Sequence, residues 1–303
     1  GTITSSSGII SSPRNASHIP FYPASTSCHW QFRPYTGPNG QSWEKTIVFK
    51  ANRIRIAKFN HETGEYCTSA LTFRTGTSDS PKFLVSPRLI CGQINEPTII
   101  RSPYKTNDVL FGTKQAKYTT PDLGFNITYN TFDCGGILTG PTNTIQSINY
   151  PRQYPENTDC AWLLEYPEGE QIVIPQNEVI MDLQPQSDNQ CSPSSPDYIE
   201  VRNGGEPYSP LIWRGCGNSP PPTIRSMSNK LWIVFHSSNH RSGSQSVYRG
   251  FSFQVYSSSS LGEYGGCGGH LHGQGGNISS PVDTSHPSQP NYPNNIECVY
   301  YID

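Results

Sequence analysis

The chain has 303 residues, of which 15% are charged and 33% hydrophobic, and its formal net charge at pH 7 is −2. So weak a charge leaves no basic field to hold a polyphosphate, which argues against nucleic acid as a partner. Gly and Pro contribute 27 residues each and Tyr 17. This mixture disfavours helices and favours half-buried strands, so the composition predicts an all-β sandwich or barrel.

The longest apolar runs have the length of a strand. One of them, Leu231-Trp232-Ile233-Val234-Phe235, is far shorter than the roughly 20 residues that cross a bilayer. The sequence therefore predicts no membrane span, and no signal peptide opens it. Either a signal has been removed or the chain is part of a longer protein.

Nine cysteines are spread along the chain, at positions 28, 67, 91, 134, 160, 191, 216, 267 and 298. No Cys-x-x-Cys occurs, so the pattern indicates a disulfide framework rather than a zinc site. Such a framework is typical of an oxidising compartment. Three Asn-x-Ser/Thr acceptors agree with it, at Asn15, Asn126 and Asn277. We predict a secreted or cell-surface glycoprotein with glycans at these sites.

One motif occurs three times: Tyr-Pro, four residues, Cys, one residue and an aromatic residue. The copies begin at Tyr22, Tyr154 and Tyr292, which are 132 and 138 residues apart. The repeating unit is therefore a whole domain rather than a turn of a solenoid. A Ser-Pro-like turn precedes each copy, at Ser12-Pro13, Ser147-Ile148 and Ser280-Pro281.

Further landmarks recur in the same order along the chain. Cys-Gly-Gly opens the second and third units, and each full unit ends in a Gly-Phe strand with apolar residues at every second place. That period is typical of a strand with one solvated face, and Asn126 falls on this face of the first such strand. The predicted organisation is a domain over 1–131 that lacks its first Cys, a complete domain over 134–257, a Gly/Ser linker over 258–266 and an opening fragment over 267–303.

The repeat accounts for the cysteines when each unit pairs its early cysteines with each other and its late ones with each other. The predicted bridges are Cys67–Cys91, Cys134–Cys160, Cys191–Cys216 and Cys267–Cys298. Cys28 is left over. By analogy with Cys134 and Cys267, we expect its partner just upstream of Gly1, and the alternative is a reactive free thiol.

Taken together, the Cys-Gly-Gly start, the Tyr-Pro-x4-Cys-x-Trp motif, the later Cys, Asp-Tyr-Ile-Glu-Val and Cys-Gly, and the closing Gly-Phe strand resemble the CUB domain family. The likeness is strongest over the second unit, from Cys134 to Tyr256. It implies compact sandwiches of two antiparallel sheets with jelly-roll-like topology. The uninterrupted tandem arrangement is most similar to cubilin-like arrays.

Many members of this family bind calcium through three acidic positions, and the ion helps to fix loops that grip a lysine of a partner. Calcium takes six to eight oxygen ligands, and carboxylates supply most of the attraction. In the second unit the matching positions are Gln184, Asp197 and Ser238, of which only Asp197 is acidic. The alternative is a residual site in which Asp182 or Asp188 supports Asp197.

In the first unit the counterparts of the last two positions are Ala70 and Lys114. A methyl group and a cation thus replace two carboxylates. We therefore expect no calcium site in these two units, and no cofactor.

For the candidate catalytic and metal-binding residues of this sequence, a purely structural role is the preferred interpretation. No hydrolase signature is present. His61-Glu62 begins like a zinc-protease helix but lacks the second His, and His270-Leu271-His272 could offer two imidazoles without a third ligand. His236 and His240 are read as loop residues. Trp30 and Trp162 follow bridged cysteines, so we expect them in the core. We expect Pro220-Pro221-Pro222 to form a rigid loop rather than a polyproline ligand.

The sequence therefore predicts no enzyme. The leading hypothesis is a non-catalytic binding or scaffold array that contacts other extracellular proteins, including further CUB modules of the same protein. The alternatives are the regulatory arm of an extracellular protease and a structural component of an extracellular matrix or filament. A protease domain in the flanking sequence would favour the former alternative.

Overall fold

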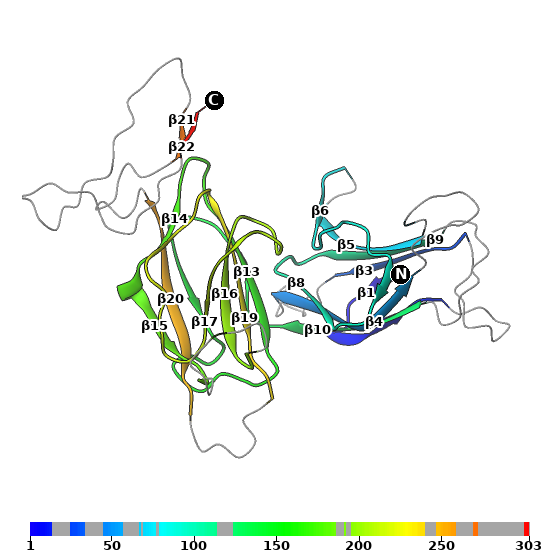
Figure 1. The fold of residues 1–303 in the computed structure, drawn as a ribbon, viewed down its shortest axis with the longest axis horizontal. Coiled ribbons are helices and arrows are strands. Elements are labelled where there is room, and N and C mark those ends of the chain that lie inside the picture. Colours follow the sequence, from blue (N-terminus) through cyan, green and yellow to red (C-terminus); the bar gives the residue numbers. More distant parts are fainter. Residues whose placement is uncertain are drawn as a thin grey trace, which may run out of the picture. The chain divides into compact units, whose positions relative to one another are not determined.

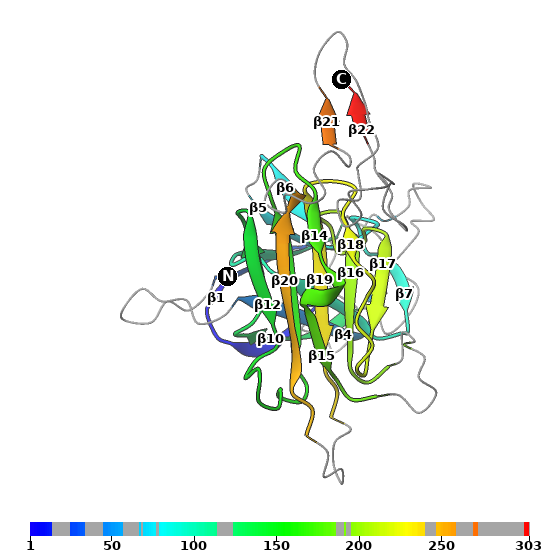
Figure 2. The same cartoon turned by 90° about the vertical axis from the view of Figure 1, so that its left-hand side faces the viewer.

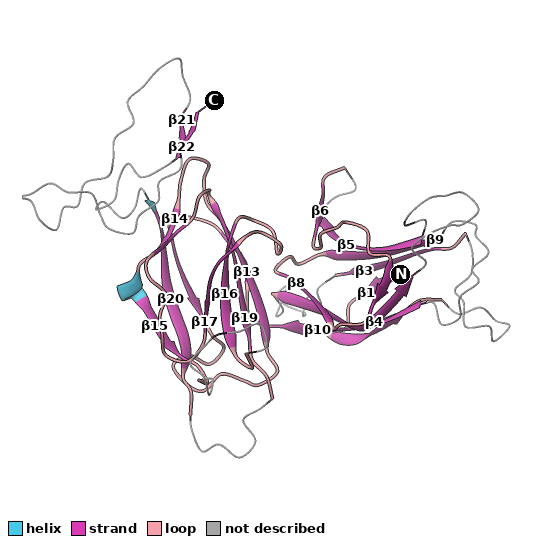
Figure 3. Cartoon of the chain, viewed as in Figure 1, coloured by secondary structure: helices cyan, strands magenta, loops and turns pink. Residues whose placement is uncertain are grey.

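The computed structural model describes residues 1–13, 25–33, 45–56, 67, 69–76, 79–113, 124–185, 191, 195–239 and 247–258, and the backbone of 269–271 and 300–302. The chain divides into two compact units, Gly1–Gly136 and Ile137–Asp303 (Figure 1). Strands dominate the described part of both units, where helix is confined to short 3-10 turns such as η1 (Gln176–Glu178) (Figure 3). The prediction of an all-β, disulfide-stapled fold is confirmed.

The first unit is a sandwich of two five-stranded sheets. One sheet has the order β1 (Thr2–Ile3), β3 (Ser27–Phe32), β9 (Asn107–Thr113), β5 (Ser69–Gly76) and β6 (Pro81–Phe83). The other has the order β2 (Ser7–Ser11), β10 (Gly124–Phe132), β4 (Thr46–Ile56) and β7 (Gly92–Ile94), and β8 (Thr98–Ser102) also pairs with β4.

Apolar side chains at every second position of these strands meet between the two sheets. In β5, for example, Leu71 and Phe73 are buried while the residues between them are partly exposed. Phe32 packs edge-on against both Phe49 and Tyr129, with ring centroids 4.9 Å apart in each case. Each fully buried side chain of this size stabilises the sandwich by about 1.5–3 kcal/mol.

The second unit repeats this architecture (Figure 2). One sheet has the order β11 (Gly136–Leu138), β13 (Asp159–Glu165), β19 (Lys230–His236), β16 (Tyr198–Asn203) and β17 (Leu211–Gly215). The other has the order β12 (Thr142–Gln146), β20 (Gly250–Ser257), β14 (Ile172–Ile174) and β18 (Ile224–Arg225), and β15 (Val179–Asp182) pairs with β20.

Equivalent residues of the two units make equivalent contacts. Trp30 packs edge-on against Phe125 at 6.0 Å, and Trp162 packs in the same way against Phe251 at 6.1 Å. Trp162 is 4% exposed, and Trp30 packs against the core of its own unit. The expected role of these two indoles in the core is confirmed.

A serine and a glycine explain two of the recurring sequence landmarks. Gly250 has a φ of +90°, and a Cβ there would collide with the hydroxyl of Ser147, which accepts the N–H of Phe251 at 3.2 Å. In the first unit Ser12 accepts the N–H of Phe125, also at 3.2 Å, and a Cβ at Gly124 would likewise collide with its hydroxyl. The Ser-Pro-like turn and the Gly-Phe strand of each unit are thus two halves of one contact.

Beyond Ser258 the structure describes only one pair of short strands. β21 (Gly269–Leu271) lies parallel to β22 (Tyr300–Ile302), and Gly269 stands opposite Tyr300. The first unit opens with the same arrangement, because β1 is parallel to β3. The rest of the proposed third unit, including His272, Asn277 and both of its cysteines, lies outside the described residues.

Candidate partner-binding site

Asp197 directly precedes β16, and the residue is 1% exposed. One carboxylate oxygen accepts the hydroxyl of Tyr154 at 2.6 Å. The other accepts the N–H of Ser238 at 2.9 Å and its hydroxyl at 3.2 Å. Tyr154 in turn accepts the N–H of Gln184 at 3.0 Å. Protein donors therefore already serve both oxygens of this carboxylate.

The three matched residues Gln184, Asp197 and Ser238 thus lie in one hydrogen-bonded network, but the donor set does not fit calcium. Asp197 supplies the only negative charge among these three residues, and the hydroxyl of Ser238 donates a hydrogen bond to its carboxylate. Oε1 of Gln184 is buried without a hydrogen-bond partner, but it could offer calcium only one uncharged oxygen ligand. Nowhere in the described part of the chain do three His, Cys, Asp or Glu side chains gather as a metal would need. Asp182 accepts the N–H of Arg249 instead, and Asp188 lies outside the described residues.

The strand register corrects one expected counterpart in the first unit. Leu71 stands opposite Phe111 in the same way that Ile199 stands opposite Phe235, so Ser69 rather than Ala70 takes the place of Asp197. Ala70 stands opposite Gly112 on the other face, because a shift by one residue reverses the face of a strand. Ser69 is fully buried and brings no charge. Lys114 lies outside the described residues.

We expect calcium at millimolar concentration to leave the melting temperature of the two units unchanged within about 1 °C. A ligand at one hundred times its dissociation constant would add roughly 2.7 kcal/mol, which a thermal scan detects easily. The measurement compares scans in calcium and in chelator. A fall of several degrees on chelation that disappears in Asp197→Ala would contradict this prediction.

A row of charged and aromatic side chains crosses the sheet of the second unit that holds β16. Glu200 is 7% exposed and accepts hydrogen bonds from the guanidinium groups of Arg202 and Arg214. Arg214 also lies over the ring of Tyr198, 5.5 Å from its centroid. Burial raises the pKa of Glu200, but the hydrogen bonds and charges of the two arginines together outweigh it and hold that pKa below its ordinary value.

His236 continues the same row. It ends β19 rather than lying in a loop, so the loop reading of this residue was wrong. Its Nδ1 is 2.7 Å from a carboxylate oxygen of Asp159, and its ring packs against Tyr198 at 5.2 Å. His240, like His61, lies outside the described residues.

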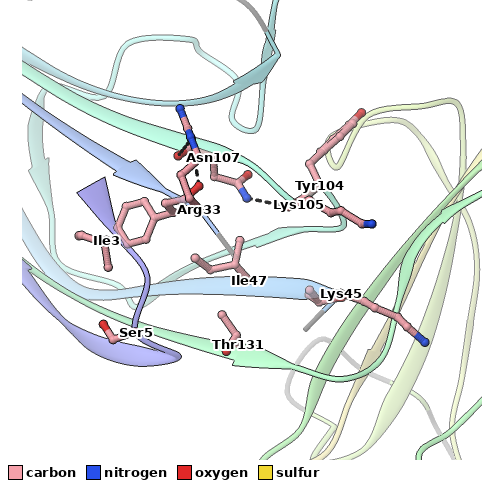
Figure 4. Close-up of a pocket in the computed structure, with 11 residues that line it drawn as sticks. Ile3, Ser5, Arg33, Lys45, Ile47, Tyr104, Lys105, Asn107 and Thr131 are labelled. Carbon is pink, nitrogen blue, oxygen red and sulfur yellow. Dashed lines mark hydrogen bonds between the residues drawn. The ribbon is translucent and has the colours of Figure 1, made fainter. Parts of the chain in front are cut away.

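A small pocket of about 30 Å³ opens at one end of the first unit (Figure 4). Three cations from separate segments line it, namely Arg33 after β3, Lys45 before β4 and Lys105 between β8 and β9. None of the described residues that line it is a carboxylate. Sequence analysis missed this pocket because its cations are 12 and 60 residues apart and converge only when the sandwich forms.

Six cysteines of the two units are disulfide-bonded. Cys67 is joined to Cys91 and Cys191 to Cys216, with Cα atoms 5.5 and 5.7 Å apart. The third of the three disulfides takes the remaining bonded cysteines, Cys134 and Cys160. Cys28 is free and half-buried, and burial raises the pKa of its thiol, which disfavours the reactive thiolate.

In a longer protein we expect Cys28 to be bonded to a cysteine within two residues upstream of Gly1. Thr2 stands opposite Gln31, so continuing this parallel ladder places Cys28 opposite the second residue before Gly1. In the sequence, Cys267 and Cys298 each stand two residues before Gly269 and Tyr300, which are opposite each other in β21 and β22. Non-reducing peptide mapping tests the prediction. Alkylation of Cys28 in the native longer protein would contradict it.

Asn126 is exposed on β10, opposite Ser11 on one side and Arg53 on the other. A glycan on its amide would extend away from the sandwich. The other predicted acceptors, Asn15 and Asn277, lie outside the described residues. The described residues contain no helix that is long and apolar enough to span a membrane.

Residues 134–254 match the CUB domain family. The chain is 33% identical to cubilin of Rattus norvegicus over 98% of its own length, which is 7% of the length of that cubilin. Tolloid-like protein 1 of Homo sapiens is 34% identical over 56% of this chain and 14% of that protein. The CUB1-EGF-CUB2 domains of rat MASP-1 align over 84% of this chain and 99% of that chain, at 18% identity and a TM-score of 0.31.

Residues 134–254 of this chain belong to the CUB domain family. The chain as a whole is similar to cubilin, of whose length it spans about 7%.

Proposed function

We propose that the chain consists of non-catalytic protein-binding modules of a secreted or cell-surface multi-CUB glycoprotein. The observation that carries this proposal is the extent of the likeness to cubilin, which runs through both units and covers 98% of the chain. Two units of the same topology present several solvated rims and sheet edges, and such a surface suits the capture of large extracellular partners.

The Asp197 network favours binding that does not depend on calcium. In the family, the ion fixes loops that hold a lysine of the partner, whereas here Tyr154 and Ser238 hold the only carboxylate of the matched set. Hydrogen bonds thus hold the described residues Gln184 and Ser238 in the network of Asp197, and this supports partner recognition through other surfaces.

The experiment presents immobilised chain 1–303 to proteins of a conditioned extracellular medium and identifies the retained proteins by mass spectrometry. We expect at least one retained protein to bind saturably when purified, with soluble chain competing and with equal binding in calcium and in chelator. Cys191→Ala/Cys216→Ala is the control, because it weakens the fold of the second unit without changing charge.

Two other outcomes would replace the proposal. The similarity to tolloid-like protein 1 keeps the regulatory arm of a protease as a second candidate, which a protease domain in the parent sequence would favour. Filaments of purified chain in electron micrographs, without any saturable soluble partner, would favour a structural role. Cleavage of a retained protein by the chain itself would contradict the non-catalytic reading.

A further inference from the structure

The two units carry opposite net charge. Residues 1–136 hold 14 Lys and Arg against 8 Asp and Glu, and residues 137–303 hold 7 against 15. The net charges are therefore +6 and −8, which give the −2 of the whole chain. The first unit is therefore positively charged although the net charge of the whole chain is close to zero. Long-range attraction by such a unit raises its rate of association with a negatively charged partner.

Among the residues that the structure describes, few carboxylates pair with the cations at the pocket of Figure 4. Arg33 is held by Asp108 at 3.3 Å. Lys45 is 3.9 Å from Asp133, and with both side chains more than half exposed this pair is weak. Lys105 makes no ion pair with any residue that the structure describes. Glu44, next to Lys45 in the sequence, lies outside the described residues.

A fourth cation adjoins the pocket. The ammonium group of Lys82 lies 5.5 Å from the centre of the ring of Tyr104, which lines the pocket beside Lys105. Figure 4 shows Lys45 and Lys105 extending to the same side of the pocket. Two mobile ammonium groups can therefore close on one anionic group, while Arg33 remains fixed by its carboxylate partner.

We propose that this pocket of the first unit, which we call the basic pocket, receives a carboxylate side chain of an acidic protein partner. Its lining combines the apolar groups Ile3, Phe32 and Ile47 with hydroxyl and amide groups and the cations at its edge. An Asp or Glu side chain matches this combination, because its methylene carbons contact the apolar groups while the carboxylate meets Lys45 and Lys105.

The shape of the basic pocket favours a protein side chain over a sulfated polysaccharide. Its volume of about 30 Å³ admits one small group, not a sugar ring. A linear polyanion would be held by a stripe of cations along a surface. Here Arg33, Lys45 and Lys105 lie at the edge of a single hollow instead.

This proposal rests on the proposed protein-binding function and adds the chemistry of the partner. The probe is poly-L-glutamate of about 50 residues, applied to the immobilised chain 1–303 at about 50 mM salt, with heparin as the second probe. We expect saturable binding of polyglutamate that weakens as salt rises.

Lys45→Glu/Lys105→Glu should weaken polyglutamate binding at least tenfold. Arg53→Glu/Arg88→Glu is the matched control, since it makes the same change in charge at two exposed arginines of the same unit that do not line the pocket. We expect less than a threefold effect there. Thermal scans of both variants check that the unit remains folded.

Three results would overturn the proposal: no binding of polyglutamate, equal weakening in both variants, or heparin bound at the basic pocket and not displaced by polyglutamate. The last result would assign the pocket to sulfated glycans. If Lys45→Glu/Lys105→Glu leaves capture of the extracellular partners unchanged, the basic pocket is not their site while the proposed protein-binding function stands.

Discussion

Replacing Glu200 by glutamine is expected to lower the free energy of unfolding of the second unit by about 3 kcal/mol at pH 7. The change leaves two largely buried guanidinium groups without their shared carboxylate, and breaking a buried ion pair on one side typically costs 3–5 kcal/mol. The arginine side chains are 24% and 15% exposed, so we expect a value at the lower end. The melting temperature of this unit should fall by roughly 10 °C.

The same variant has a pH signature. The pKa of Glu200 is lower in the folded state than its ordinary value of 4.5, so its stabilising effect is fully present above pH 4.5. That effect is lost as the pH falls through the lowered pKa. Urea unfolding at pH 7 and near pH 3 should therefore show a wide gap between the wild type and Glu200→Gln that narrows in acid. Glu168→Gln, at an exposed turn, serves as the control and should show little change. A gap that does not depend on pH would contradict the ion-pair explanation.

Replacing Asp197 by alanine is expected to cost about 2–4 kcal/mol. It removes the acceptor for the hydroxyl of Tyr154 and for the N–H of Ser238, and a buried donor left without a partner costs about 1–3 kcal/mol. The loss should be the same in calcium and in chelator, because the carboxylate acts as an acceptor of hydrogen bonds. Thermal unfolding under both conditions provides the measurement.

Asp182→Ala is the matched control for Asp197→Ala. Asp182 is also an aspartate beside a loop of the second unit, but its side chain is 35% exposed and its partners are the N–H and the exposed side chain of Arg249. We expect a cost below about 1 kcal/mol there. Equal losses in the two variants would mean that the buried network of Asp197 is not the cause.

Much of the fold follows from local rules that a sequence displays. Alternating apolar residues predict strands such as β10 and β20, because a strand in a sandwich buries every second side chain. The Gly-Phe and Ser-Pro-like landmarks recur together because the serine hydroxyl of one packs against the glycine of the other. A side chain at Gly250 would collide with the hydroxyl of Ser147. Fixed spacing from a bridged cysteine correctly predicts the burial of Trp162.

The details that the sequence alone does not reveal depend on neighbouring strands. Glu200 lies between the buried residues Ile199 and Val201 of β16, and two arginines cover it, one of them from β17. The position equivalent to Asp197 is Ser69 and not Ala70, which only the pairing of β5 with β9 reveals. The basic pocket requires three segments to converge. Pairwise registers of this kind arise from tertiary packing, so no single stretch of sequence carries them.

The parallel opening strands have a mechanical consequence. A pull on the start of the first unit acts along β1, whose hydrogen bonds to β3 run across the direction of the force and must break together. At the start of the second unit the load arrives at Cys134, and its disulfide carries the tension into β13, which lies inside the sheet. Strand β11 is thereby relieved of the load.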